Sequence, residues 1–342
     1  MTKYGPEPAH LMRPFLVLLF VGSLAASARA EHSPAPGTTR VARWKDDKQA
    51  AFTMGFDDSI PNHLTLVIPE LRKRRMAATF YLIADSGELK QKKAAWEAVA
   101  GTNDGVAVFG DHTMTHRGVA GLEAARQEIG HAGEIIQAMQ PGKSPRLMSF
   151  AQPGVPAGKW NLTGDEQRQI LAEYHLVDRG DFRGHGAMFH QKTADEMVGL
   201  ADAALAKGGV EYIVFHSVGP GTIPTPEPLF MDFLNKLEGR RDRLWITDHI
   251  SAYKYETERD SAEVRTDEAT PRRLRLSVRS AADPQFFDGA LTLITAVPVG
   301  WSRCQITQGK NRTVATAANG AVLYEALPGA DPILIEPVSA GP

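Results

Sequence analysis

The alternation of strand-like and helix-like stretches constrains this chain most strongly. Apolar strand-like runs occur at residues 50–56, 78–83, 106–109, 147–150, 176–177, 212–215 and 244–246. Helical patterns lie between them at residues 63–75, 122–139, 165–174, 194–207 and 228–237. Such alternation predicts a parallel sheet with crossover helices. Its length and regularity favour an α/β fold, an open or incomplete (β/α) barrel, over residues 41–260.

The pattern changes after residue 259. Leu274, Leu276 and Val278 alternate with polar side chains, which is the period of a strand. Further short apolar runs follow at 291–296, 304–307, 322–325 and 333–335, with no helical pattern between them. Residues 262–342 are therefore predicted to form a small C-terminal antiparallel β domain resembling a sandwich.

The N-terminus has the pattern of an export signal. Lys3 and Arg13 precede an apolar run at 15–21, and Ala28-Arg29-Ala30 supplies the small residues of a cleavage site. A transmembrane anchor would need roughly 20 apolar residues, and this run is shorter. We predict a signal peptide at 1–30, a flexible leader at 31–40, and an exported protein, periplasmic or extracellular, with no stable membrane span after cleavage.

Composition narrows the classes of partner. The formal net charge of −2 provides no basic field, which argues against nucleic acid as a partner. Cys304 is the single cysteine, so no intramolecular disulfide can form and stability must come from a core. The sequence leaves the oligomeric state open.

Two adjacent carboxylates end the first apolar run. Asp57 and Asp58 follow Phe56 directly, and like charges this close repel each other unless a cation or a proton offsets them. A solvated turn is the alternative interpretation of such a pair. The pair therefore becomes informative only together with polar residues elsewhere in the chain.

Histidines follow two later strand-like runs. His112 and His116 come after the run at 106–109, and their i, i+4 spacing predicts one face of a helical turn with both rings directed at one point. Three ligands that leave an open position are what a catalytic metal needs. His216 closes the run at 212–215, the strand end at which barrel enzymes place reactive groups. Exposed or core histidines are the alternative for each.

In this order, the three motifs resemble those of the polysaccharide deacetylases of carbohydrate esterase family 4, which have the NodB homology fold. Asp57-Asp58 resembles the first motif of that family, His112 and His116 its second, and His216 its last. The resemblance extends over roughly residues 40–258 and implies the distorted (β/α) barrel.

The resemblance also implies roles for these residues. Asp58, His112 and His116 would bind a divalent cation, zinc with cobalt or nickel as alternatives. Asp57 would be the general base and His216 the general acid. The implied reaction is hydrolysis of N-acetyl or O-acetyl groups on an acetylated glycan, in which the cation polarises the carbonyl.

Two motifs depart from the family pattern. The third motif normally supplies an arginine that orients the base, but here Ala151 precedes Gln152 and Pro153, and the proline alone matches. The fourth motif, which normally tunes the acid histidine, lacks its tryptophan here, and Arg179 or Asp181 could supply a supporting partner in its place. We expect Gln152, Pro153, Arg179 and Asp181 to contact the substrate or to support the site.

Three alternatives remain beside this hypothesis. A metal-dependent hydrolase of non-sugar amides could use the same barrel. A carbohydrate-binding protein with a catalytically impaired barrel would explain the missing arginine. A non-haem iron oxygenase also uses two histidines and a carboxylate. Those sites sit on a β-sandwich, which the barrel pattern disfavours.

Overall fold

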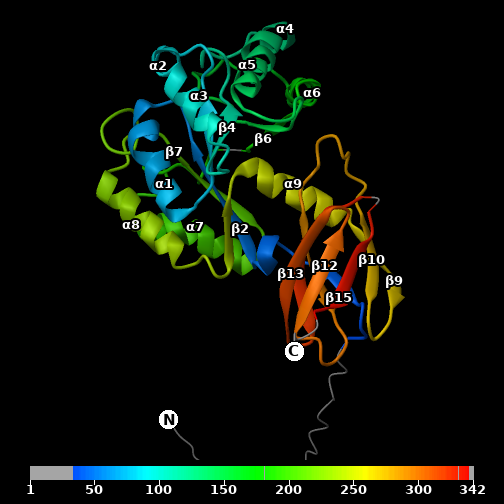
Figure 1. Cartoon of the computed structure of the whole chain (residues 1–342). Helices are drawn as coiled ribbons and strands as arrows, with labels where there is room; N and C mark the ends of the chain where they lie inside the picture. The colour runs from blue at the N-terminus through cyan, green and yellow to red at the C-terminus, as the bar shows by residue number, and fades with distance from the viewer. Residues whose placement is uncertain (1–33, 181, 330, 339–342) are drawn as a thin grey trace, which may run out of the picture. The chain divides into compact units, whose positions relative to one another are not determined.

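The computed structural model describes residues 34–180, 182–329 and 331–338 (Figure 1). The predicted signal peptide and the first residues of the predicted leader lie outside the described residues. Within these ranges, no helix combines the length and the apolar character needed to cross a membrane.

Seven strands of the described chain form a parallel sheet, as predicted. Its order is β6-β5-β4-β3-β2-β7, and β8 also pairs with β2. The first half of β2 pairs with β8 and its last two residues pair with β3, so the sheet splits along this edge. The strands are β2 (Ala50–Phe56), β3 (Ala78–Leu82), β4 (Ala107–Asp111), β5 (Met148–Phe150), β6 (Leu176–Asp178), β7 (Val210–Phe215) and β8 (Leu244–Thr247).

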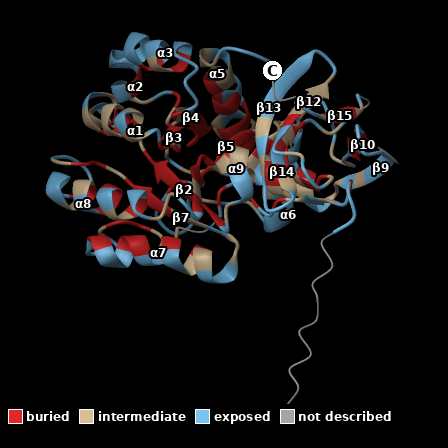
Figure 2. Ribbon diagram, turned by 60° about the horizontal axis from the view of Figure 1, so that its bottom comes forward, coloured by how far each residue is buried: buried red, intermediate tan, exposed pale blue. Residues whose placement is uncertain are grey.

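Helices follow the strands and cover the sheet. They are α1 (Ile68–Arg74), α2 (Gly87–Gln91), α3 (Lys93–Gly101), α4 (Leu122–Ala125), α5 (Ala132–Met139), α6 (Gly164–Glu173), α7 (Ala194–Lys207), α8 (Glu227–Glu238) and α9 (His249–Asp260). Two π-helical turns, His63–Val67 and Arg126–His131, lead into α1 and α5. A short 3-10 turn, Lys45–Asp47, precedes β2. The buried residues concentrate in the strands and on the inward faces of α7 and α8 (Figure 2).

An aromatic cluster forms the centre of the barrel core. The Phe56 ring stacks on Phe80 and Phe215 at centroid distances of 5.0 and 5.3 Å, and Phe230 of α8 meets Phe56 edge-on. All four side chains are fully buried. The cluster lies at the end of β2, so it fixes the strand end from which Asp57 and Asp58 emerge.

Helix α9 begins against the interior of the parallel sheet. Asp248 caps it by accepting the Ser251 N–H at 3.0 Å. The His249 backbone N–H donates to Thr79 Oγ1 on β3, and its Nδ1 lies 2.7 Å from Ser149 Oγ on β5. The apolar pattern of the sequence does not predict this helix, because its residues are mostly polar.

The C-terminal domain is an antiparallel sheet, as predicted. Its order is β1-β11-β14-β13-β12-β15-β10-β9, so the strands form one continuous sheet instead of two facing ones. Thr266 Oγ1 on β9 donates to Gly37 O near β1, which brings the two edges together. The strands are β1 (Thr39–Val41), β9 (Glu263–Ala269), β10 (Leu274–Arg279), β11 (Leu291–Ala296), β12 (Arg303–Gln308), β13 (Asn311–Ala318), β14 (Ala321–Ala326) and β15 (Ile333–Pro337).

The two sheets share buried residues. Trp44, Trp245 and Tyr255 pack together with centroid distances between 5.5 and 6.3 Å, and their cluster continues into the core of the antiparallel sheet. The Tyr255 hydroxyl donates to Ala42 O at 3.0 Å. The described residues from Pro34 onward accordingly belong to one compact unit.

Candidate active site

The candidate residues emerge where parallel strands end. Asp57 N–H donates to Phe215 O, His112 N–H to Leu82 O and Arg179 N–H to Phe150 O, at 2.8 to 3.0 Å. Each of these hydrogen bonds continues the pairing of neighbouring strands by one residue beyond the strand end. Because the carboxyl ends of parallel strands meet at one edge, side chains from β2, β4, β6 and β7 converge there.

The prediction that His112 and His116 lie on a helical turn is wrong. They belong to an irregular loop after β4, in which Thr113 and His116 have φ of +69° and +61°. Asp111 Oδ1 accepts the Thr113 N–H at 2.7 Å, and Thr113 Oγ1 accepts the His116 N–H at 3.0 Å. These side-chain bonds stabilise the left-handed backbone and bring the imidazole centroids to 5.0 Å.

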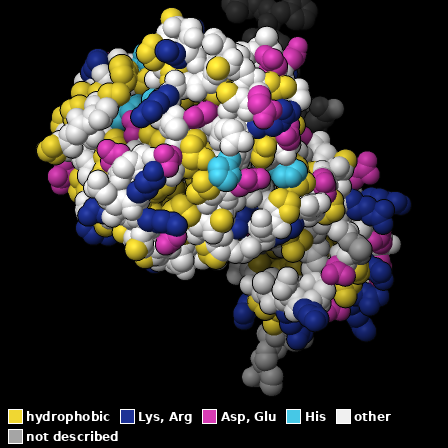
Figure 3. All heavy atoms as spheres, turned by 90° about the horizontal axis from the view of Figure 1, so that it is seen from above, with side chains coloured by type: hydrophobic (Ala, Val, Ile, Leu, Met, Phe, Trp, Pro, Cys, Tyr) yellow, Lys and Arg dark blue, Asp and Glu magenta, His cyan; other side chains and the backbone are white. Residues whose placement is uncertain are grey.

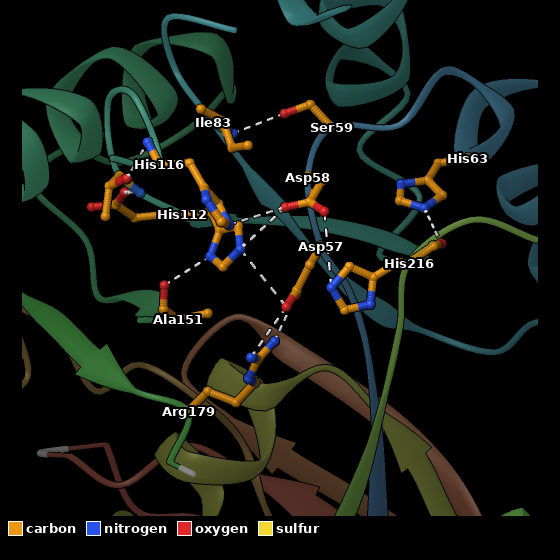
Figure 4. A network of polar contacts seen from close by, with 12 residues as sticks. Asp57, Asp58, Ser59, His63, Ile83, His112, His116, Ala151, Arg179 and His216 are labelled. Atoms are coloured by element: carbon orange, nitrogen blue, oxygen red, sulfur yellow. Dashed lines mark hydrogen bonds and ion pairs between the residues drawn. The ribbon is translucent and has the colours of Figure 1, made fainter. Parts of the chain in front are cut away.

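Asp58 faces both imidazoles (Figure 4). His116 Nε2 lies 3.4 Å and His112 Nε2 3.5 Å from Asp58 Oδ1. One ligand atom from each residue fits within 4.8 Å of the others. Asp58 Oδ1 is buried and has no hydrogen bond within the described residues, as expected for an oxygen that takes a cation.

The backbone around Asp58 is held in an uncommon conformation. Asp58 and Ser59 have φ of +77° and +56°, so two successive non-glycine residues occupy the left-handed region. Ser59 Oγ accepts the Ile83 N–H at 2.8 Å and anchors this turn to β3. Strain of this kind is typical of sites in which side-chain direction matters.

The imidazole of His112 is oriented by a backbone bond. His112 Nδ1 donates to Ala151 O at 2.8 Å, so Nε2 is the ring nitrogen that faces Asp58. Ala151 is fully buried and stands where the family pattern has its arginine. This position therefore supports a histidine through its carbonyl.

Arg179 takes the place of the missing arginine, but from another strand. Its Nη1 and Nη2 donate to Asp57 Oδ1 and Oδ2 at 2.7 and 3.3 Å, and both side chains are 4% exposed. Burial alone would raise the pKa of Asp57, but Arg179, with His112 and His216, lowers this pKa to about 2. Asp57 is therefore ionised across the physiological range.

Glycines make room for this arginine. The Arg179 guanidinium lies 4.5 Å from the ring centroid of Tyr81, which is fully buried. A Cβ on Gly55 would come within 3.3 Å of Arg179 Nη1, and one on Gly110 would come within 2.7 Å of the Tyr81 ring. The Tyr81 hydroxyl lies 2.7 Å from Ser149 Oγ, which also bonds His249.

His216 lies on the other side of Asp58. Its Nε2 is 3.8 Å from Asp58 Oδ2. His63 Nε2 lies 2.8 Å from His216 O, and burial lowers the pKa of His63 to about 4, so neutral His63 donates this bond. His63 therefore fixes the backbone of His216, a role for which its sequence context gave no signal.

The remaining predicted residues are placed as follows. Gln152 and Pro153 line the same cavity as Asp57, Asp58 and His216. Asp181 lies outside the described residues. Tyr81, Phe182 and Phe189, which the sequence analysis did not single out, also contribute to this region.

Comparison with known families agrees with this geometry. Residues 45–170 match the model of the family described as polysaccharide deacetylase. The match covers less than half of the chain, and over this segment the chain is similar to that family. The matched segment contains Asp57, Asp58, His112 and His116, whereas Arg179 and His216 lie beyond it.

Several known proteins are similar to this chain at low identity. A gellan lyase from a Bacillus species is 21% identical over 351 residues, which are 90% of this chain and 14% of that protein. A family 4 carbohydrate esterase from Streptomyces lividans, solved with acetate, is 18% identical with a TM-score of 0.43, covering 60% of this chain and 95% of the other. A family 4 acetyl xylan esterase from Clostridium thermocellum, solved with cobalt, is 21% identical with a TM-score of 0.39. The match covers 59% of this chain and 90% of that esterase. A CE4 family pseudoenzyme from Bacillus anthracis is 14% identical with a TM-score of 0.41. The match covers 59% of this chain and 65% of that protein.

Proposed function

We propose that this chain is a metal-dependent deacetylase that hydrolyses acetyl groups, N-linked or O-linked, on a glycan. The observation that carries the proposal is the convergence of a base, three ligands and an acid at one sheet edge. Asp57 is bound by Arg179, Asp58 faces His112 and His116, and His216 lies opposite.

The ligand set supports a divalent cation. Asp58, His112 and His116 offer one oxygen and two nitrogens, a combination that suits zinc, with cobalt or nickel as alternatives. The unsatisfied Asp58 Oδ1 and the bond from His112 to Ala151 O both favour metal binding. When bound, the cation would act as a Lewis acid on the acetyl carbonyl and offset the charge that develops on its oxygen.

The flanking residues supply the proton transfers. The Asp57 carboxylate accepts a proton from the attacking water, and Arg179 keeps it ionised and oriented. Oxygen–carbon bond formation and cleavage of the acetyl C–N or C–O bond follow. His216 donates the proton that the departing amine or alcohol requires, so the products are acetate and a free amino or hydroxyl group.

Export is part of the proposal. The signal pattern at 1–30 supports a periplasmic or extracellular location, where envelope and extracellular glycans are found. Expression of the full chain in a secreting host, followed by N-terminal sequencing of the exported product, tests this. A start at Glu31 supports export; cytoplasmic retention of the uncleaved chain contradicts it.

Acetate release tests the activity. The purified protein is chelated, reloaded with zinc, cobalt or nickel, and supplied with acetylated chitooligosaccharides, acetylated xylan or small cyclic amides. We expect metal-dependent acetate release from a glycan. Turnover of the cyclic amides alone would favour the non-sugar amidase, and glycan binding without turnover under any metal would favour the impaired barrel.

Two isosteric variants separate metal binding from proton transfer. Asp57→Asn should abolish acetate release while retaining bound metal, because Asp57 serves as the base. Asp58→Asn should lose the metal, because Asp58 supplies the anionic ligand. Metal content by elemental analysis and acetate release are measured on both. Equal metal retention in the two variants would contradict this division.

A further inference from the structure

A half-exposed phenylalanine lies at the mouth of the catalytic cavity. The cavity has a volume of ≈ 700 Å³ and is lined by Asp57, Asp58 and His216, and also by Phe189 and Ile223. The Phe189 side chain is 50% exposed. Leaving an aromatic ring in water forgoes its burial energy, so its position beside reactive groups indicates that a ligand covers it.

The loop that carries Phe189 is ordered by backbone bonds. Ala187 N–H donates to Val214 O and Val214 N–H donates to His185 O, both at 2.8 Å, so the loop is bonded to β7 close to His216. Met188, directly before Phe189, has φ of +65° and closes a turn by donating to Gln191 O. The exposed ring is therefore presented from a tightly constrained backbone.

A second phenylalanine connects this ring to the catalytic histidine. Phe182 meets Phe189 edge-on, with a centroid distance of 5.4 Å and an interplanar angle of 84°. Phe182 also lies 5.9 Å from the His216 ring in a T-shaped arrangement. The three rings form a continuous wall from the proton donor to the rim of the cavity.

An apolar residue from another loop lines the same cavity. Ile223 has φ of +46°, which is rare for a β-branched residue. Its loop is closed by bonds from Ser217 N–H to Thr222 O and from Thr225 N–H to Ser217 O, and Asn62 Nδ2 donates to Val218 O. Both apolar residues are thus held in place by their loops, as a preformed binding surface requires.

We propose that Phe189 determines substrate specificity by binding the pyranose ring of the sugar unit next to the acetylated one. This inference rests on the proposed deacetylase function. A pyranose ring presents C–H groups on its faces, and an aromatic ring binds such a face by excluding water while cavity polar groups bind the hydroxyls. The substrate is then an oligomer or polymer of acetylated sugars, with Phe189 and Ile223 contacting the neighbouring unit.

Kinetics with a long and a short substrate test this role. For Phe189→Ala, we expect kcat/KM on penta-N-acetylchitopentaose or acetylated xylopentaose to fall about tenfold, mostly through KM, since half of an aromatic ring's burial is lost. Hydrolysis of 4-nitrophenyl acetate, which has no neighbouring sugar, should fall by a clearly smaller factor than turnover of the oligomers. Phe189→Trp should restore oligomer turnover. Val314→Ala, at a β13 residue that is also 50% exposed, is the matched control and should change neither.

Binding keeps the test independent of turnover. In an Asp57→Asn background, calorimetry with the same two oligomers should show about tenfold weaker binding after Phe189→Ala. If the wild-type protein releases no acetate but the Phe189→Ala change still weakens oligomer binding, the proposed deacetylase reaction fails and the binding role of Phe189 stands. Equal losses on the oligomers and on 4-nitrophenyl acetate, unchanged oligomer kinetics, or no oligomer binding by any variant would overturn the role of Phe189.

Discussion

At the scale of single residues, the site depends on a carboxylate that stays ionised although it is buried. The bidentate contact from Arg179 stabilises Asp57 in this state. Such a pair contributes little net stability compared with an apolar pair, but removing one partner leaves an unpaired buried charge. The bond between these two residues is therefore the most sensitive point of the site.

Replacing Arg179 should affect both stability and the pH dependence of turnover. Arg179→Met should destabilise the fold by about 3 to 5 kcal/mol. It should also raise the pKa of Asp57, because only His112 and His216 then oppose the effect of burial, and the acid limb of kcat should move to higher pH. Urea denaturation and kcat–pH profiles measure the two effects.

An exposed pair provides the control for this variant. Arg240 also makes a bidentate contact, to Asp202, but at the surface. Arg240→Met should cost less than about 1 kcal/mol and leave the pH profile unchanged. In Asp57→Asn/Arg179→Met, stability should recover while activity stays lost. A double variant no more stable than Arg179→Met would argue against an unpaired charge as the cause.

Fully buried His63 and partly buried His249 should make stability depend on pH. Burial lowers the pKa of both His63 and His249 to about 4 in the folded protein, against about 6.5 unfolded. Their contribution is present above pH 6.5 and is lost as the pH falls through 6.5 toward 4, about 3 kcal/mol for each. Urea denaturation of wild type and His249→Gln between pH 7 and 4.5 should show a shallower decline in the variant.

Exposed His131 supplies the matched control for that measurement. His131→Gln should follow the wild-type curve. Parallel curves for wild type and His249→Gln would show that His249 does not titrate in this range.

The sequence identified site residues whose types and spacing carry chemical meaning, and the structure brings Asp57, Asp58, His112, His116 and His216 together. It offered Arg179 and Asp181 as alternatives for the motif that tunes the acid histidine; Arg179 instead contacts Asp57, and Asp181 lies outside the described residues. His63 and Tyr81 could not be found this way. Each residue acts through its burial and through a contact with a residue distant in the sequence. A local sequence pattern predicts neither property.

At the scale of elements, the strands are short and the loops after them do the positioning. The predicted run at 50–56 and the predicted helix at 194–207 coincide with β2 and α7, because their apolar periodicity is strong. The polar strands β9 and β13 escaped prediction because most of their residues are exposed. The histidine loop was misassigned because side-chain bonds from Asp111 and Thr113, not helical periodicity, set its backbone.

Gly110 on β4 gives a test of how tightly the elements pack. A Cβ at this position would lie 2.7 Å from Tyr81 and 2.9 Å from Ser149 O, within a buried region. Gly110→Ala should therefore destabilise by about 1 to 3 kcal/mol through overpacking and lower kcat by displacing the Tyr81 ring beneath Arg179. Thermal unfolding and acetate release measure these effects.

Gly199 in α7 is the matched control, because a Cβ there meets nothing within 4 Å. Gly199→Ala should stabilise the protein by about 1 kcal/mol, since alanine is the better helix former. If Gly110→Ala were as stable and active as wild type, the close packing of Tyr81 against β4 would not be needed for the site.

At the scale of the whole molecule, the antiparallel domain behaves as part of the barrel. Trp44, Trp245 and Tyr255 belong to one buried cluster with Leu274 and Leu291 of the second sheet. The loop between β10 and β11 also contacts the barrel, where Lys254 bonds Asp288 at 2.8 Å and the Phe286 and His175 rings lie 4.4 Å apart. A detachable binding module would not share a core in this way.

Deleting residues 262–342 should therefore abolish folding instead of removing a separate function. The truncation exposes the cluster around Trp44 and leaves β1 without its partner strand. We expect an insoluble product, and a single cooperative unfolding transition for the intact protein. A soluble truncated protein that releases acetate but no longer binds insoluble glycan would instead identify the domain as a binding module.

Strand β1 has a consequence for the order in which the molecule can assemble. Thr39 pairs with Thr295 of β11, a partner 256 residues later. Because the chain is synthesised from its N-terminus, β1 stays unpaired until the late strand β11 is available. The loop that must then be closed includes the whole barrel. This sheet can therefore close only at the end of biosynthesis. In a chain that is secreted unfolded, it can close only after translocation is nearly complete.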